Sequence, residues 1–251
     1  MLSAKMEDYL KAIYELQRET GDRVTTSALA DALDVTPPTA SSMLDTLADR
    51  GFVEREKYAG ATLTTEGETV ALEVVRHHRL IETYLTEHLG YDLTEVHDEA
   101  DRLEHHISEA FERRVADVLD DPTVDPHGDP IPDESLEPVD EAGGETLGSH
   151  DVGDVLVIER VSDRDPEELA YLSERGLTPD TEIEVVEVAP IDMVTVRVGD
   201  EEISVPDRIA NLIRVRPADT GPGETSTTDV GPSDGDSDEP NERTADNAEV
   251  N

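Results

Sequence analysis

Apolar side chains recur every three or four residues through the first part of the chain, the spacing typical of amphipathic helices. Met6, Leu10, Ile13 and Tyr14 form such a stripe, and Leu16 extends it. The pattern predicts a first helix over this stretch, with its apolar face turned toward a core.

A tight pair of short helices and a ribbon are predicted to follow. The first of these helices covers 26–33. The next begins at Thr36, a good N-cap, with Pro37 in the first helical position, where a missing N–H costs nothing. Two short apolar runs within 52–64 predict a two-stranded ribbon. Helix, turn, helix and ribbon together indicate a winged helix-turn-helix over 1–65.

Two longer helices are predicted next. Thr65 and Glu68 can form a capping box that starts a helix over 66–89. Apolar residues at helical spacing continue in a second helix over 95–119. We therefore expect a helical domain over 66–140.

The spacing of apolar residues changes in the last third of the chain, where apolar and polar residues alternate over short stretches. One helix, over 166–174, interrupts this region. Strands are predicted over 155–161, 182–188, 193–198, 202–205 and 209–215. Five short strands joined by turns suit a small β-barrel over 151–216, so the fold class is α+β.

Two stretches break these patterns. Prolines and a Gly-Gly pair crowd 120–150, which reads as a linker. Residues 217–251 contain no Leu, Ile, Met or aromatic residue and carry a net charge of −9. Such a segment cannot bury enough apolar surface to offset its ordering entropy, and we expect a disordered acidic tail.

The charge of the chain limits which partners and which environment are expected. The chain carries 62 acidic and 20 basic residues, a net charge of −42, and no cysteine. This balance excludes a basic nucleic-acid coat, a polybasic membrane protein and a disulfide framework. No run of 18 apolar residues predicts a membrane span, and acidic residues appear too early for a signal peptide. We expect a cytoplasmic protein, and the clear periodicity favours a folded, halophilic protein over a disordered acidic chain.

The excess charge is uneven. Residues 1–60 carry a net charge of only −4, and from 35 to 48 the only charged residue is Asp45. Short hydroxyl side chains let a helix N-terminus approach phosphates and base edges. A winged helix can also serve as a protein-contact module, but this contrast favours double-stranded DNA. The residues expected to bind DNA are Thr36, Pro38, Thr39, Ser41, Ser42, Arg50 and Lys57.

Histidines gather in the predicted helical domain, where six of the eight fall between 77 and 106. His78 and Glu82 lie four apart on one helix. The next helix places four candidates on one face: His97, Asp101, Glu104 and His105. Imidazole and carboxylate without sulfur suit Mn²⁺ or Fe²⁺, with other divalent transition metals as alternatives. A solvated acidic face with incidental histidines is the competing interpretation.

Four segments give the chain a resemblance to a known family. They are MEDYLKAIYEL at 6–16, HRLIE at 78–82, VHDEADRLEH at 96–105 and PHGDPIP at 126–132. In this order they resemble the diphtheria toxin repressor family, which includes the manganese transport regulators. The resemblance covers residues 1 to about 216. It implies a metal-dependent transcriptional repressor with a winged-helix domain, a helical dimerisation domain and an SH3-like C-terminal domain.

The resemblance also implies two sets of ligands for Mn²⁺ or Fe²⁺. The primary set is Asp8, Asp101, Glu104 and His105, and the ancillary set is His78, Glu82, His97, Asp165 and Glu168. Asp8 lies on the first helix, so the metal is expected to tie the DNA-binding domain to a homodimer core. Ligation would fix two recognition helices about one DNA turn apart, roughly 34 Å, which shifts the population toward the DNA-binding form.

Some positions depart from the family pattern. Iron-type members have Met and Cys where this chain has Asp8 and Asp101, and two carboxylates make a harder site that favours Mn²⁺. The binuclear manganese type has a glutamate where this chain has Lys11. Other manganese-type relatives use residues matching Glu82, Asp125 and His127 for a second site. Which metal and which second set apply stays open at this stage.

Asp165 and Glu168 also have a purely structural explanation. Asp165-Pro166-Glu167-Glu168 is an ordinary helix start, with Asp as the N-cap, Pro at the first position and Glu at the third. The sequence leaves ligation and capping both open for these two carboxylates.

Two further function classes compete with a regulator. His97-Asp98, downstream of His77-His78, could belong to a metal-dependent phosphohydrolase of HD type, but neighbours on a helix diverge by about 100°. An iron-transport accessory protein could be built on the barrel, but it would leave the winged helix unused. Because no HExxH, P-loop, GxSxG or GxGxxG is present, an enzyme is not expected.

Overall fold

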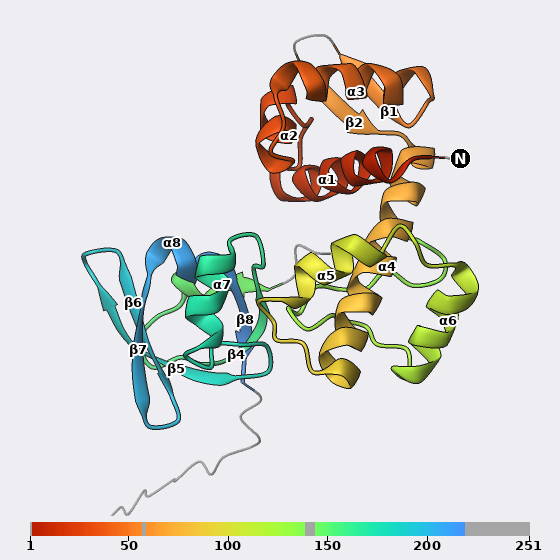
Figure 1. Ribbon diagram of the computed structural model, residues 1–251. Coiled ribbons are helices and arrows are strands. Elements are labelled where there is room, and N and C mark those ends of the chain that lie inside the picture. Colours follow the sequence, from red (N-terminus) through yellow and green to blue (C-terminus); the bar gives the residue numbers. More distant parts are fainter. Residues whose placement is uncertain (1, 57–58, 139–143, 219–251) are drawn as a thin grey trace, which may run out of the picture. The chain divides into compact units, whose positions relative to one another are not determined.

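The computed structural model describes residues 2–56, 59–138 and 144–218, and its element labels are those of Figure 1. The predicted disordered tail lies outside these residues except for its first two positions. No helix within the described ranges is long and apolar enough to cross a membrane.

The first domain is the predicted winged helix-turn-helix (Figure 1). Its helices are α1 (Ala4–Thr20), α2 (Thr26–Ala32) and α3 (Pro37–Asp49), and its ribbon pairs β1 (Val53–Glu56) antiparallel with β2 (Gly60–Leu63). Thr36 caps α3 by accepting a hydrogen bond from the Thr39 N–H. The core includes Leu10, Ile13 and Leu44, so α1 packs in one apolar cluster with the recognition helix.

The helical domain contains α4 (Thr65–Leu89), α5 (Val96–Leu103) and α6 (Glu109–Val118). Helix α4 begins one residue before the predicted start, because Thr64, not Thr65, caps it by accepting from the Gly67 N–H. The single helix predicted over 95–119 is wrong. The chain leaves the helix at Glu104 and begins a new one at Ser108, whose hydroxyl accepts from the Phe111 N–H.

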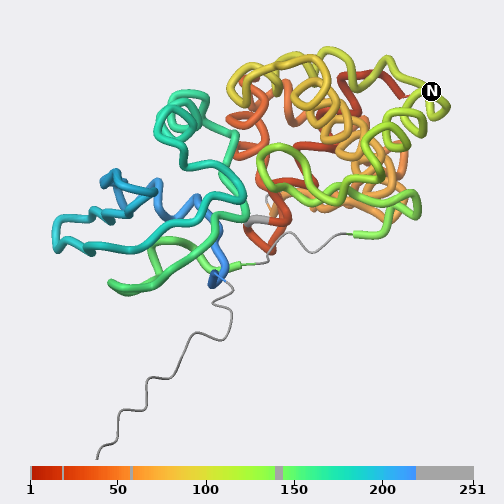
Figure 2. Tube along the Cα trace, turned by 90° about the horizontal axis from the view of Figure 1, so that it is seen from below, coloured from red at the N-terminus to blue at the C-terminus, as the bar shows by residue number. Residues whose placement is uncertain are grey.

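The linker predicted over 120–150 is wrong for most of the described residues, because 120–138 pack against the helices and 145–149 form β3 and η1 of the last domain. Figure 2 shows the yellow-green segment after α6 folding back toward the helices. Ile131 is buried with Leu80 of α4 and Val115 of α6. Arg79 and Arg76 donate hydrogen bonds to the Pro130 and Pro132 carbonyls at 2.5 Å each. Prolines are typical of breaks between elements, but the carbonyls of Pro130 and Pro132 accept from buried arginines, so donors and acceptors are both satisfied.

The last domain is a six-stranded antiparallel sheet in the order β3-β8-β4-β5-β6-β7. The strands are β3 (Glu145–Thr146), β4 (Val155–Val161), β5 (Glu182–Ala189), β6 (Met193–Val198), β7 (Glu201–Pro206) and β8 (Ile213–Pro217). Helix α7 (Pro166–Ser173) matches the predicted one. The strand predicted over 209–215 is half wrong, since α8 (Asp207–Ala210) occupies its beginning. A short 3-10 turn, η1 (Leu147–Ser149), follows β3.

The segment after α6 also contacts this last domain. The Val161 N–H of β4 donates to the His127 carbonyl at 2.9 Å. The neighbouring Gly128 has a φ of +89°, and a Cβ there would lie 1.9 Å from the Glu159 carbonyl oxygen. Only glycine permits this approach, and it brings the loop that carries His127 against the strand that leads to Asp163.

Candidate metal centre

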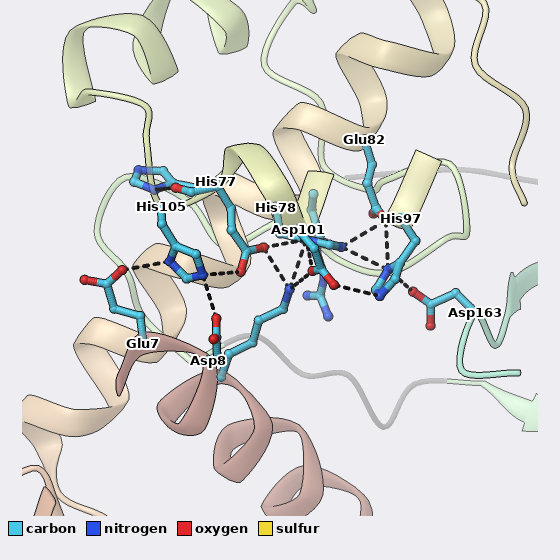
Figure 3. A network of polar contacts seen from close by, with 12 residues as sticks. Glu7, Asp8, His77, His78, Glu82, His97, Asp101, His105 and Asp163 are labelled. Carbon is cyan, nitrogen blue, oxygen red and sulfur yellow. Dashed lines mark hydrogen bonds and ion pairs between the residues drawn. The ribbon is translucent and has the colours of Figure 1, made fainter. Parts of the chain in front are cut away.

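Imidazole and carboxylate side chains from three domains form a connected network on and around α4 and α5 (Figure 3). It contains three groups whose ligand atoms all lie within 4.8 Å of one another. We call them the Asp8 cluster (Asp8, Glu104, His105), the Asp163 cluster (Glu82, His97, Asp163) and the His78 cluster (His78, His97, Asp101).

The Asp8 cluster joins the DNA-binding domain to the turn after α5. His105 Nε2 lies 2.6 Å from Asp8 Oδ1 and 3.2 Å from Glu104 Oε1, and His105 Nδ1 lies 2.7 Å from Glu7 Oε2. The end of α5 at Glu104 places Glu104 and His105 in this turn, so the helix break that the sequence did not predict shapes the cluster. Burial raises the pKa of the Asp8 carboxyl, and the nearby His105 opposes that shift.

The Asp163 cluster joins the helical domain to the loop after β4. His97 Nδ1 lies 3.2 Å from Glu82 Oε1 and 3.2 Å from Asp163 Oδ2. Burial alone would lower the pKa of His97, but hydrogen bonds with the Asp163 and Glu82 carboxylates raise it to about 10. The hydrogen bond with His97 and the charges of His127 and His97 lower the pKa of Asp163 to about 2 despite burial and the nearby Glu82.

His127 lies beside the Asp163 cluster. Its side chain is fully buried, and Nε2 lies 3.8 Å from Glu82 Oε1. Among the described residues neither ring nitrogen has a hydrogen-bond partner. A buried imidazole without such partners is unusual. Because both ring nitrogens lack a partner, either could serve as a metal ligand.

The His78 cluster lies between the other two. His78 Nε2 is 2.9 Å from Glu82 Oε1 and 3.1 Å from His97 Nδ1, while His78 Nδ1 is 2.6 Å from Glu104 Oε2 and 3.2 Å from Asp101 Oδ1. Burial and the charge of Lys11 oppose protonation, but Glu82 and these hydrogen bonds raise the pKa of His78 well above its usual value.

Seven of the nine expected ligands therefore lie in this network, and two lie outside its three groups. Asp165 caps α7, accepting hydrogen bonds at Oδ1 from the Glu167 and Glu168 N–H groups. Glu168 forms an ion pair with Arg208. From this domain Asp163, two residues before the expected Asp165, reaches His97.

Sequence reasoning missed Asp163 because no motif marks it. Its placement depends on the end of β4 and on the loop that contains Gly128, which meet although they are far apart in the chain.

The alternative second ligand set, Glu82, Asp125 and His127, is only partly brought together. His127 lies near Glu82, whereas Asp125 Oδ1 accepts from the His127 and Asp129 N–H groups. Burial and the neighbouring Asp129 raise the pKa of Asp125 well above its usual value.

Six of the seven residues expected to bind DNA lie on α3 or cap its ends. Those that are exposed are Thr36, Pro38, Thr39, Ser42 and Arg50. Three of them line a shallow hollow with Lys5, Met43 and Thr46: Pro38, Thr39 and Ser42. Lys57 lies outside the described residues.

Ser41 differs from the others because it is half-buried against the ribbon. Arg55 of β1 donates to the Ser41 carbonyl at 2.9 Å and to its hydroxyl at 2.7 Å, and also pairs with Asp45. Arg55 thus holds the ribbon to α3 and neutralises the carboxylate on the outer face of that helix.

Three family models match the chain in sequence order. The iron-dependent repressor N-terminal DNA-binding domain matches residues 1–61, and the iron-dependent repressor metal-binding and dimerisation domain matches 64–133. The FeoA domain matches 145–217. Together they cover the three domains described above.

Full-length relatives agree with these matches. The diphtheria toxin repressor of Corynebacterium efficiens is 32% identical over 226 residues, which covers 85% of this chain and 95% of that protein. The iron-dependent repressor IdeR of Mycobacterium tuberculosis is 32% identical over 221 residues, covering 83% of this chain and 95% of that protein. The HTH-type transcriptional regulator MntR of Oceanobacillus iheyensis is 33% identical over 145 residues, which covers 56% of this chain and 97% of that protein.

Solved structures match the fold over the same length. A manganese-dependent transcriptional repressor in complex with manganese has a TM-score of 0.77 at 35% identity, covering 85% of this chain and all of that chain. ScaR with bound Zn²⁺ has a TM-score of 0.72 at 33% identity, covering 85% of this chain and 99% of that chain. The chain belongs to the iron-dependent repressor family, that of the diphtheria toxin repressor, IdeR and MntR, whose members are metal-dependent DNA-binding transcriptional repressors.

Proposed function

We propose that the chain is a homodimeric, cytoplasmic repressor of metal-uptake genes whose affinity for promoter DNA is raised by Mn²⁺ or Fe²⁺. The observation that carries the proposal is the Asp8 cluster. One ligand comes from α1 of the winged-helix domain, and two come from the turn after α5 of the helical domain. An ion held by these residues would tie the two domains together.

The ligand chemistry suits these ions. Every candidate ligand atom is a carboxylate oxygen or an imidazole nitrogen, a set typical of Mn²⁺ and Fe²⁺. The unpartnered ring nitrogens of the buried His127 and the convergence of Glu82, His97 and Asp163 support a second ion there. A bound ion would supply fixed positive charge to acidic side chains that otherwise repel one another.

Each residue's part in the switch follows from its element. Asp8 lies on α1, which shares an apolar core with α3, so fixing Asp8 also fixes the recognition helix. Glu7 hydrogen-bonds the second ring nitrogen of His105 and orients the ring. The surface of α3, rich in hydroxyls and with Asp45 paired to Arg55, then lies against DNA.

We assign dimerisation to the helical domain. Large apolar side chains are exposed on it: Leu89 at 57%, Phe111 at 47% and Val118 at 59%. We assign these side chains to a contact with a second copy of the chain, which is the occupant that the family model for this domain implies. Two recognition helices would thereby meet two half-sites of one operator.

The geometry favours a regulator over a phosphohydrolase of HD type. That chemistry needs the adjacent His97 and Asp98 to converge on one ion. His97 faces Glu82 and Asp163, whereas Asp98 is exposed and belongs to none of the three clusters. An iron-transport accessory role leaves the winged helix without a purpose.

A fluorescence-anisotropy titration tests the proposal. The full chain in molar KCl is titrated onto DNA from the promoters of metal-uptake genes, with Mn²⁺, with Fe²⁺ under anaerobic conditions, and after chelation. Stronger binding with either metal, reversed by chelation, supports the proposal. Equal binding with and without metal contradicts the switch, and no binding under any condition contradicts the repressor. Light scattering under the same conditions tests the homodimer.

A further inference from the structure

The ammonium of Lys11 lies where ligand atoms of the His78 cluster and the Asp8 cluster meet. Its Nζ is 2.9 Å from His78 Nδ1, 3.1 Å from Asp101 Oδ1 and 2.8 Å from Glu104 Oε2. The side chain comes from α1, and its three partners belong to α4, α5 and the residue that ends α5. Only 12% of the Lys11 side chain is exposed.

The three partners are the kinds of atom that hold a divalent ion: one imidazole nitrogen and two carboxylate oxygens. The Lys11 ammonium donates N–H groups to the two carboxylate oxygens and places a positive charge beside them. The Glu104 side chain is only 2% exposed, and burying a carboxylate without a cation beside it is unfavourable. The chain thus supplies its own positive charge beside Glu104 and Asp101.

Glu104 shows how the two neighbouring sites are separated. Its Oε2 faces Lys11 and His78, while its Oε1 faces His105 in the Asp8 cluster. One oxygen is thus neutralised by the lysine, and the other is left for the Asp8 cluster. Asp101, expected from the sequence to join Asp8, instead pairs with Lys11 and His78.

We infer that Lys11 is a tethered cation that fills the pocket of His78, Asp101 and Glu104. The chain then holds one ion in the Asp8 cluster and one in the Asp163 cluster, and no third ion between them. Lys11 also links α1 to α4 and α5 before any metal binds. This inference rests on the proposed metal dependence.

Counting bound ions tests it. The wild-type chain, Lys11→Met, Lys11→Glu and the control Lys5→Met, an exposed lysine of the same helix, are dialysed to equilibrium against Mn²⁺ in molar KCl and analysed for manganese. We expect two ions per protomer in the wild type and in Lys5→Met, and three in both Lys11 variants. Three ions in the wild type, or two in both Lys11 variants, would overturn the inference. No manganese in any chain contradicts the proposed function itself.

Thermal unfolding gives a second readout that does not depend on counting. In the presence of a chelator, Lys11→Met should unfold at a lower temperature than the wild type, because Asp101 and Glu104 lose the ammonium that pairs with them. Saturating Mn²⁺ should then raise the Tm of Lys11→Met by more than that of the wild type. An equal rise in the two chains would overturn the tethered-cation role, even if the variant is less stable overall.

Discussion

The Asp8 and Asp163 clusters use the same ligand chemistry in opposite electrostatic settings. In the Asp8 cluster, His105 faces three carboxylates, those of Glu7, Asp8 and Glu104, and burial raises the pKa of Asp8. In the Asp163 cluster, His97 and two carboxylates already form ion pairs, which raise the pKa of His97 to about 10 and lower that of Asp163 to about 2.

This difference separates two roles. The Asp8 cluster has an excess of negative charge and includes a residue of the DNA-binding domain, so an ion bound there would act directly on the recognition helix. The Asp163 cluster pairs one imidazole with two carboxylates and joins the helical domain to the last domain. An ion bound there would have to displace a proton from His97 and would act on DNA binding only indirectly.

The largest expected effect comes from removing the imidazole of the Asp8 cluster. His105→Ala should abolish the metal-dependent gain in DNA affinity, a loss of about 10- to 100-fold at saturating Mn²⁺. Anisotropy titration measures it. His106→Ala, an exposed histidine next in the chain, is the matched control and should behave as wild type. If His105→Ala kept the full metal response, the Asp8 cluster would not be the site that controls DNA binding.

A smaller effect is expected from the Asp163 cluster. Asp163→Ala should weaken binding of one Mn²⁺ by about 10-fold while most of the metal response of DNA binding is kept. Calorimetric titration with Mn²⁺, paired with anisotropy, separates the two quantities. If Asp163→Ala abolished the DNA response as completely as His105→Ala, the two clusters would have the same role.

Asp165→Ala should affect stability and not metal binding. Asp165 caps α7, so its loss should lower the free energy of unfolding by about 1 kcal/mol. Chemical denaturation with and without Mn²⁺ measures this, and the stabilisation by the ion should match that of wild type. A reduced stabilisation by Mn²⁺ would return Asp165 to the ligand set that the sequence suggested.

The smallest effect is a pH dependence of the metal-free protein. Because the folded-state pKa of His97 is raised to about 10 from an ordinary value of 6.5, its ion pairs stabilise the fold fully below pH 6.5. This contribution is lost as the pH rises through about 10. The Tm difference between the chelated wild type and His97→Ala should therefore shrink over that range. A difference that grows with pH would contradict the ion pairs.

The fold was largely predictable because its elements depend on local patterns. Thr36 and Pro37 mark the start of α3, and the alternation over 193–198 marks β6. The errors arose where local signals compete. The helical pattern of 95–119 hid the Ser108 cap that divides α5 from α6, and the prolines of 120–150 suggested a linker where buried arginines bind the carbonyls of Pro130 and Pro132.

The sequence by itself determined the ligand types, the winged helix and the absence of thiolate chemistry, because composition and helical spacing carry that information. The tertiary structure decided which carboxylates meet which histidines. Asp163 reaches His97, and Lys11 reaches His78, Asp101 and Glu104, through contacts between residues 66 to 93 positions apart. Periodicity describes neighbours along one element, whereas such a meeting depends on how separate elements pack, which no local pattern encodes.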